Sequence, residues 1–355
     1  MKFSSVNSGR LPFVIVALFV ACLLADTAFS QSPFYKGKTI RVIQGAAAGG
    51  ALDVRVRAVI PFLEKYIPGN PNVITEYMPG AGGGKVAGYI YNAAKPDGLI
   101  IGEAGSGFVS NAVLGQSEVT YDIDKFVYIG SADTSAHYIF FTRKQAGLTS
   151  LEKLRSHSGL RIGGQTVGQS PYLRARFFAY LIGFKEPRFV TGYSGPEVDL
   201  AMQRGEIDAR NNPAQAIMMR TPDWVEKSLM DFHAGFEVPV GNKHARFAQL
   251  PDLATFTRTE KERKLLAMLR SLTLTGSPYF LPPGTPHNLV RILQDAMRRT
   301  FEDKEFHREF EKKTGDSATP LLGEALQKVI KELPRDPEVV DLFKTIAGPD
   351  PLPAR

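Results

Sequence analysis

The groups in this sequence best suited to bind a ligand belong to the backbone rather than to side chains. The stretch GAAAGG (45–50) joins a predicted strand at 39–44 to a predicted helix at 52–67, and it contains only glycine and alanine. Such a loop turns tightly and lets a ligand approach closely. The first N–H groups of the following helix have no partner inside the helix and lie at the positive end of its dipole. This arrangement predicts an anion-binding loop.

A second glycine-rich loop, PGAGGGK (79–85), follows a predicted strand at 72–78. Two such loops at the carboxyl ends of adjacent strands favour a shared anion site. The second loop is not a P-loop, because it is one residue short and Val86 replaces the required hydroxyl. The stretch 82–87 does satisfy the dinucleotide pattern G-x-G-x-x-A, with Glu103 at the end of the next strand. Dinucleotide binding therefore stays an alternative at this point.

Few side chains form a pattern that suggests catalysis. Asp53 and Arg57 have the i,i+4 spacing of a helical ion pair, although Asp53 could also line the mouth of a ligand cleft. The stretch GYSGP (192–196) approaches a nucleophile elbow, but Pro196 stands where the last glycine belongs. Ser106 has no sequence-evident base, and the six histidines are dispersed. We expect no enzyme, with an exported enzyme using Asp53, Ser106 or a histidine as the alternative.

The N-terminus has the features of a secretory signal peptide, predicted over 1–30. Lys2 and Arg10 precede the short apolar run 11–24. Ala28 and Ser30 then supply small residues at the two positions that a signal peptidase recognises. The only cysteine, Cys22, lies in a stretch that loosely resembles a lipoprotein cleavage box, so lipid anchoring is a second interpretation. The mature chain then contains no thiol, which excludes disulfides, cysteine metal sites and a cysteine nucleophile.

The composition is that of a globular protein, with 355 residues, 43% of them apolar and 22% charged. The formal charge of +7 is spread along the chain and lacks the aromatic and basic clustering of a nucleic-acid surface. Predicted strands and helices alternate up to about residue 213, and the chain from about residue 261 is predicted to be mostly helical. This order predicts an α/β fold of two lobes with mostly parallel strands and a helical tail.

Four blocks of the sequence, taken in order, resemble a known family. They are GKTIRVIQGAAAGGALDVRVRAV, PGAGGGKVAGYIYNAAKPDGLIIG, GYSGPEVDLAMQRGEIDA, and LPPGTPHNLVRIL followed by FEDKEFHREFEKKTG. Together they are similar to the exported substrate-binding proteins of tripartite tricarboxylate transporters, the Bug receptors of Gram-negative bacteria. The resemblance runs from about Pro33 to Gly348.

This resemblance implies a type II periplasmic binding protein fold, in which two lobes joined by a hinge close over a small carboxylate. By position, the first lobe comprises 34–136 and 239–350, the second comprises 137–238, and the hinge lies near Ala136 and Val238. It further implies a periplasmic receptor that delivers its organic acid to a two-component membrane permease. We expect a monomer with no cofactor, no metal and no nucleic-acid partner. A signalling role for the same fold is the alternative.

The resemblance also implies the residues that hold the ligand. In the first lobe these are Ala46, Ala47, Ala48, Gly49, Asp53, Gly80, Ala81, Gly82, Gly83, Ser106 and Gly107. In the second lobe they are Thr166, Ser170, Tyr193, Gly195, Asp208, Asn211 and Asn212. The first loop lacks the proline and bulky residue usual in the family, and Tyr172 stands where histidine is common. These departures leave the identity of the acid open.

Overall fold

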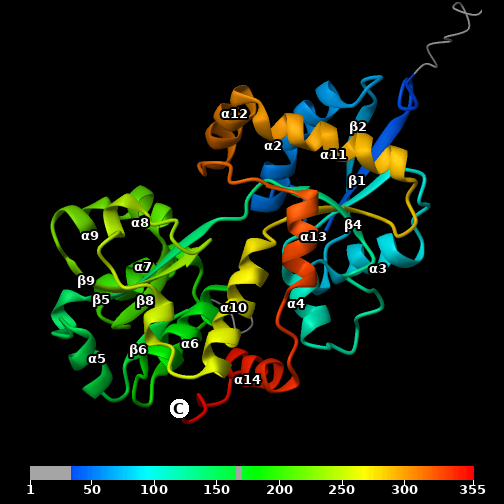
Figure 1. The fold of residues 1–355 in the computed structure, drawn as a ribbon. Helices are drawn as coiled ribbons and strands as arrows, with labels where there is room; N and C mark the ends of the chain where they lie inside the picture. The colour runs from blue at the N-terminus through cyan, green and yellow to red at the C-terminus, as the bar shows by residue number, and fades with distance from the viewer. Residues whose placement is uncertain (1–32, 165–169) are drawn as a thin grey trace, which may run out of the picture.

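The computed structural model describes residues 33–164 and 170–355, which fold into two α/β lobes (Figure 1). The predicted signal peptide and the predicted site residue Thr166 lie outside the described residues. Within the described part of the chain, no helix combines the length and the apolar character needed to cross a bilayer. The predicted fold class, α/β with two lobes and a helical tail, is confirmed.

The first lobe is built on a mixed sheet whose central strands are parallel. In spatial order its strands are β11 (Leu321–Leu322), β4 (Val127–Ser131), β10 (Pro278–Leu281), β3 (Ile100–Glu103), β1 (Thr39–Gln44) and β2 (Asn72–Tyr77). β1 pairs in parallel with β2 and β3, whereas β10 runs antiparallel to both of its neighbours. The carboxyl ends of β1, β2 and β3 therefore meet at one edge of the sheet.

Helices cover both faces of this sheet because its strands are apolar on both sides. One face packs on α2 (Ala51–Tyr66) and α11 (His287–Glu302) through a core that includes Val42, Val59 and Leu293, and α12 (Lys304–Thr314) packs on these two helices. The other face packs on α3 (Gly84–Asn92), α4 (Gly107–Val113) and α13 (Gly323–Lys331). α2 begins directly after the first glycine-rich loop (45–50) and packs on the sheet.

The second lobe has a smaller mixed sheet. Its strands, in spatial order, are β7 (Arg188–Val190), β6 (Arg161–Gly163), β8 (Ala209–Pro213), β5 (Ala136–Arg143) and β9 (Met230–Val238). Its helices are α5 (Leu151–Ser156), α6 (Ser170–Ile182), α7 (Gly195–Arg204), α8 (Ala214–Arg220) and α9 (Pro222–Glu226). β6 is parallel to β7 and β8, and β5 is antiparallel to β8 and β9.

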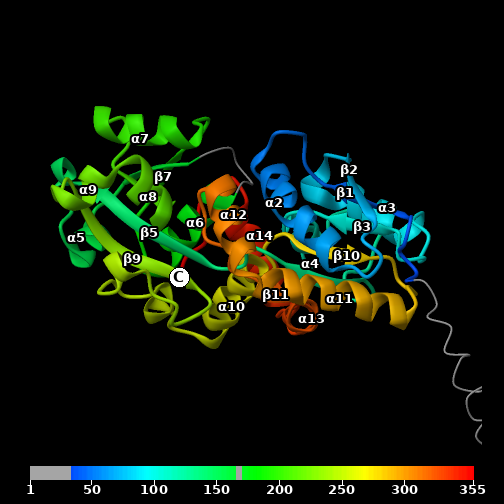
Figure 2. The ribbon, with the colours of Figure 1, turned by 90° about the horizontal axis from the view of Figure 1, so that it is seen from above.

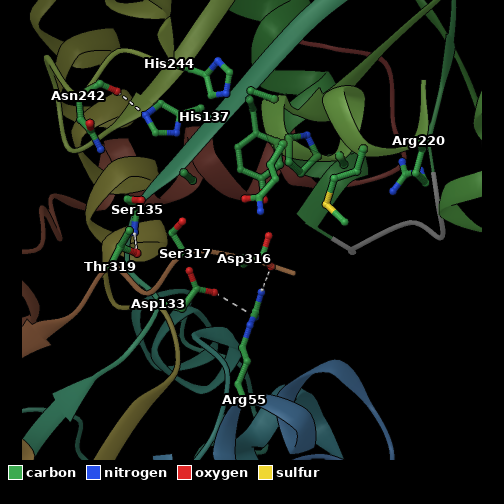
Figure 3. Close-up of a pocket in the computed structure, with 17 residues that line it drawn as sticks. Arg55, Asp133, Ser135, His137, Arg220, Asn242, His244, Asp316, Ser317 and Thr319 are labelled. Carbon is green, nitrogen blue, oxygen red and sulfur yellow. Dashed lines mark hydrogen bonds and ion pairs between the residues drawn. The ribbon is translucent and has the colours of Figure 1, made fainter. Parts of the chain in front are cut away.

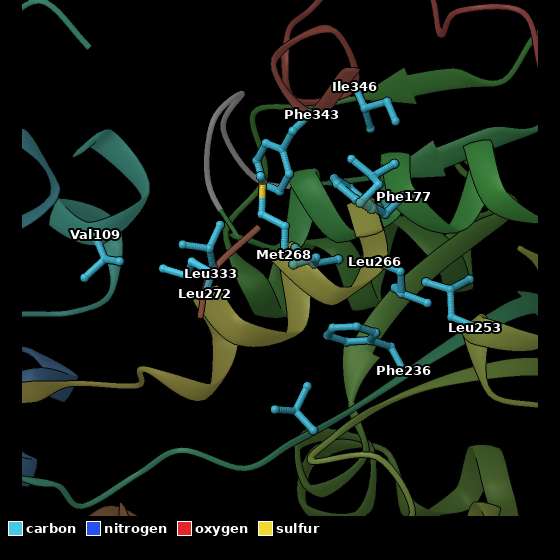
Figure 4. Close-up of a cluster of buried hydrophobic side chains, with 14 of the residues drawn as sticks. Val109, Phe177, Phe236, Leu253, Leu266, Met268, Leu272, Leu333, Phe343 and Ile346 are labelled. Atoms are coloured by element: carbon cyan, nitrogen blue, oxygen red, sulfur yellow. The ribbon is translucent and has the colours of Figure 1, made fainter. Parts of the chain in front are cut away.

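The helical tail does not follow the lobe boundary expected at Val238. α10 (Glu260–Leu274) packs on α14 (Pro337–Ala347), and α14 packs on α6 of the second lobe. Figure 4 shows Met268 of α10 and Phe343 of α14 in one apolar cluster with Phe177 of α6. Figures 1 and 2 both place α10 and α14 between the two sheets. The chain therefore passes to the first sheet again only after α10, where β10 begins.

The segments that pass between the sheets pack tightly against one another. Gly276, between α10 and β10, has a φ of +58°, and a Cβ there would lie 1.9 Å from the carbonyl oxygen of Asp133. Asp133 belongs to the segment 132–135 that joins β4 to β5. Only glycine fits at this contact, so Gly276 helps to fix how the two lobes meet.

We expect Gly276→Ala to destabilise the protein strongly. The new methyl group would clash with the backbone of Asp133, and the alanine would have to keep a left-handed backbone conformation. Gly284→Ala is the matched control, since Gly284 also has a positive φ but a Cβ there would meet nothing within 4 Å. Urea unfolding should show a loss of roughly 1–2 kcal/mol for the control and a further ~3 kcal/mol for Gly276→Ala. Equal losses would mean that this contact does not constrain the fold.

Candidate functional site

Three loops at the carboxyl ends of β1, β2 and β3 pack on one another. A Cβ on Gly45 would lie 3.0 Å from the Cβ of Ala104 and 3.2 Å from the Cα of Gly83. A Cβ on Gly107 would lie 2.5 Å from the carbonyl oxygen of Gly82. The glycines are therefore needed for close approach of the loops to each other. The structure brings the predicted loop residues of the first lobe together at one end of the sheet.

This surface offers backbone donors. Ala47 and Ala48 are exposed, Ala46 is half-buried, and their N–H groups have no hydrogen-bond partner among the described residues. In the second loop Ala81 and Gly82 are exposed. The side-chain amide of Asn111 donates to the carbonyl oxygen of Ala81 over 2.9 Å and so steadies that loop.

Two of the predicted donors are already used inside the loops. The Gly49 N–H donates to Oδ2 of Asp53 over 2.8 Å, and the Gly83 N–H donates to the carbonyl oxygen of Gly80 over 3.0 Å. Ser106 and Gly107 are half-buried where α4 begins. The donors left for a ligand are therefore fewer than the predicted set.

Asp53 braces the first loop instead of presenting a free carboxylate. Its side chain is buried and accepts hydrogen bonds from Gln44, Tyr77 and the Gly49 N–H, and it forms the expected i,i+4 ion pair with Arg57 at 3.0 Å. Desolvation raises the pKa of Asp53, but these bonds outweigh it and lower the pKa to about 2. The carboxylate is thus ionised and holds the loop in place.

In the second lobe, Asn211 and Asn212 lie at the carboxyl end of β8 and are buried. The Asn211 amide donates to the carbonyl oxygen of Pro171 over 2.9 Å. The Tyr193 hydroxyl donates to Glu206 over 3.3 Å. Ser170 and Gly195 begin α6 and α7, respectively.

Asp208 does not belong with these residues. It directly precedes β8. Pro213 lies at the other end of this strand, and the chain enters α8 from there. Arg143 and Arg161 bind its Oδ1 at 2.9 and 2.7 Å. The direction of β8 thus places Asp208 at the other end of the strand from Asn212, and the structure does not bring it together with the other predicted residues of the second lobe.

A cavity of about 770 Å³ lies between the lobes, beside the segments that pass from one sheet to the other. It is bounded by α2 on one side, by α8 on the other, and by the segments around 133–138, 242–244 and 316–319. None of its lining residues is among those predicted to hold the ligand, although Ala136, where the hinge was expected, is one of them. The cavity nevertheless adjoins both predicted sets, since Arg55 follows the first loop on α2 and Pro213 follows Asn212.

The charges in this cavity are nearly balanced. Arg55 binds Asp133 at 3.0 Å and Asp316 at 3.2 Å (Figure 3). Burial raises the pKa of Asp133, although the Arg55 guanidinium opposes this effect. Across the cavity, Arg220 of α8 forms an ion pair with Asp199 of α7 at 3.0 Å. No sequence pattern predicts the Arg55 cluster, because its partners are distant in the chain.

Two histidines line the same cavity near the passages between the sheets. The ring centroids of His137 and His244 are 5.8 Å apart, and Nε2 of His137 lies 2.5 Å from the carbonyl oxygen of Asn242. Burial, and then the nearby His137, lower the pKa of His244. No cluster of three or more His, Cys, Asp or Glu side chains suited to a metal occurs among the described residues.

The dinucleotide alternative does not fit this geometry. Glu103 is 1% exposed and lies beneath the loops, so its carboxyl group cannot reach a ribose hydroxyl at the surface. Ser106 has no hydrogen-bonded base among the described contacts. What the arrangement can do is to hold a negatively charged group on backbone amides at the edge of a cleft.

Known structures share this fold. A TctC solute-binding protein from Polaromonas superposes with a TM-score of 0.63 at 20% identity, covering 88% of this chain and 98% of that one. The periplasmic binding protein BugD gives 0.56 at 18% identity over 88% and 98%. MatC from Rhodopseudomonas palustris with bound malate gives 0.54 at 19% identity over 87% and 99%. The fold implied by the sequence resemblance is thereby confirmed.

No protein-family model matches the chain, and a search of curated proteins finds no match. The similarity is therefore one of fold, because these proteins differ from this chain at about four of every five aligned positions.

The role of Asp53 can be tested with Asp53→Asn, because an amide cannot accept all of the bonds that the carboxylate accepts. We expect the variant to lose about 2 kcal/mol of stability at pH 7. Since the pKa of Asp53 is lowered to about 2 in the folded protein, the wild-type advantage is present above pH ~4 and is lost as the pH falls toward ~2.

Urea unfolding of the wild type and the variant from pH 7 to pH 2 measures this difference. Asp223→Asn is the control, because Asp223 forms an exposed i,i+4 pair with Lys227, and it should change stability by less than about 1 kcal/mol. A difference between wild type and Asp53→Asn that stays constant with pH would contradict the role of Asp53 as an ionised brace.

Proposed function

We propose that this protein is a periplasmic solute-binding receptor that captures a small organic acid between its two lobes. One observation carries the proposal. The glycine-rich loops converge at the start of α2, and the N–H groups of Ala46, Ala47 and Ala48 have no partner among the described residues. The helix that follows this loop lines the cavity between the lobes through Arg55. The fold shared with solute-binding proteins, one of them described with bound malate, supports the same conclusion.

The energetics suit a carboxylate. Neutral N–H donors bind a charged group without burying a second charge, which avoids much of the desolvation cost of a buried ion pair. Hydrogen bonds to a charged group contribute about 1.5–3 kcal/mol each. A few such bonds, less the entropic cost of association, suffice for micromolar affinity. Closure of the lobes about the segments 132–135 and 275–277 would then cover the acid.

The partner and location follow from the family resemblance. We propose export to the periplasm and delivery of the acid to a two-component membrane permease of the tripartite tricarboxylate type. The receptor would act as a monomer, without cofactor, metal or nucleic acid. A signalling role on the same fold would use the same ligand site and differ only in the partner that recognises the closed form.

A thermal-shift screen of the mature chain tests the ligand class. The panel contains malate, succinate, citrate and benzoate, with glucose and putrescine as neutral and cationic controls. An acid present at 100 times its dissociation constant should add about 2.7 kcal/mol to the free energy of unfolding. If only glucose or putrescine raises the melting temperature, the proposed class of ligand is wrong.

The loop itself is tested with Ala47→Asp, which sets a negative charge among the free amides. We expect the acid that binds most tightly in the panel to lose at least tenfold in affinity, measured by calorimetry. Ala47→Asn is the matched control, because it has the same shape without the charge, and it should retain most of the affinity. Equal affinities for the wild type and Ala47→Asp would remove this loop from the site.

A further inference from the structure

A row of polar side chains crosses the first sheet directly beneath the start of α2. Gln44 of β1 is the register partner of Tyr77 on β2 and of Glu103 on β3, and Glu103 is the partner of Tyr279 on β10. Register partners on adjacent strands point to the same face of a sheet, and the strands lie about 4.8 Å apart. Gln44 and Glu103 are therefore side by side at the end of the sheet that carries the glycine-rich loops.

In this row, three buried acceptor oxygens of Gln44 and Glu103 have no hydrogen-bond donor among the described residues. Nε2 of Gln44 donates to Oδ1 of Asp53 over 3.1 Å, which leaves Oε1 of Gln44 without a donor. Both carboxyl oxygens of Glu103 also lack a donor among the described residues. The two side chains are 0% and 1% exposed. Neighbouring buried groups that offer only acceptors require a proton between them, because leaving them unpaired is costly.

The charged groups around Glu103 do not supply a direct partner. From α2, Asp53 and Arg55 act on it electrostatically, and from β10 its register partner Tyr279 does so as well. Arg55 is already bound by Asp133 and Asp316. Asp53 is ionised, so a second negative charge on Glu103 would be repelled as well as desolvated.

We propose that Glu103 keeps its proton in the folded protein at neutral pH and donates it to Oε1 of Gln44. The resulting chain runs from the Glu103 carboxyl through the Gln44 amide to the Asp53 carboxylate, and from there to the Gly49 N–H of the first loop. Glu103 is thus a positioning residue, which acts on the loop through Gln44 and Asp53. Its importance for ligand binding rests on the proposed function, whereas the presence of the proton does not.

The electrostatic environment agrees with this geometry. Burial raises the pKa of Glu103 well above its ordinary range; Arg55 opposes this shift and Asp53 adds to it. A raised pKa in the folded state stabilises the protein at low pH, and this contribution is lost as the pH rises from about 4.3 through the folded-state pKa. Ionisation would also place a negative charge behind the amides that we assign to the anion.

Infrared spectroscopy of the mature chain tests the proton directly. We expect the wild type at pH 7 to show a carboxylic-acid C=O band that is absent from Glu103→Gln. The exposed Glu118→Gln serves as the control and should keep the band. Glutamine has the shape of the protonated carboxyl group and can donate to Gln44, so the variant should fold. Identical spectra for the wild type and Glu103→Gln in this region would overturn the proposal.

The melting temperature as a function of pH gives a second measurement. The melting temperature of Glu103→Gln minus that of the wild type should grow between pH 5 and pH 9, because only the wild type loses a proton from this site. Glu118→Gln should follow the wild type throughout. A difference that does not change with pH would mean that Glu103 is ionised over the whole range.

Amide hydrogen exchange at Gly49 tests the link to the loop without any ligand. Corrected for the intrinsic pH dependence of exchange, its protection should fall toward pH 9 in the wild type and stay constant in Glu103→Gln. Protection that changes equally in both proteins would refute the positioning role. Failure of every acid in the thermal-shift screen would refute the proposed function instead, and it would leave the result for the proton unaffected.

Discussion

The site depends on the hydrogen bond between the Gly49 N–H and the Asp53 carboxylate. A loop of glycine and alanine has no side chains with which to hold itself in one shape, and its conformational freedom is large. Asp53 removes that freedom by binding the loop from below, at the positive end of α2. One negative charge fixed inside the protein thus orders the donors that we propose for an external negative charge.

The two sheets place this loop at the edge of a cleft. Parallel pairing of β1 with β2 and β3 brings three loops to the same edge, and the close contacts among their glycines join them into one surface. The segment 133–138, which leads from the first sheet to the second, lines this cleft, and Gly276 packs on the backbone of Asp133. Arg55, bound by Asp133 and Asp316, connects α2 to these passages.

Much of the fold could be predicted from local patterns, because alternation and helical periodicity report which face of an element is buried. β1 has the predicted bounds of 39–44, and α2 (Ala51–Tyr66) differs by one residue at each end from the predicted helix at 52–67. β10 was not predicted, since a four-residue apolar stretch has no distinctive period. The sequence also could not predict that α10 and α14 pack on the second lobe. An amphipathic pattern shows that one face of a helix is buried, but it does not show which part of the protein buries that face.

The sequence by itself predicted the two glycine-rich loops and the ion pair of Asp53 with Arg57, because glycine content and i,i+4 spacing act over a few residues. Only the tertiary structure decided which donors remain free, that Asp208 and Asn212 lie at opposite ends of β8, and that Glu103 faces Gln44. Those outcomes depend on strand direction and register, which are set by contacts between residues far apart in the chain. Local sequence therefore specified the chemistry of the site, and long-range packing specified its geometry.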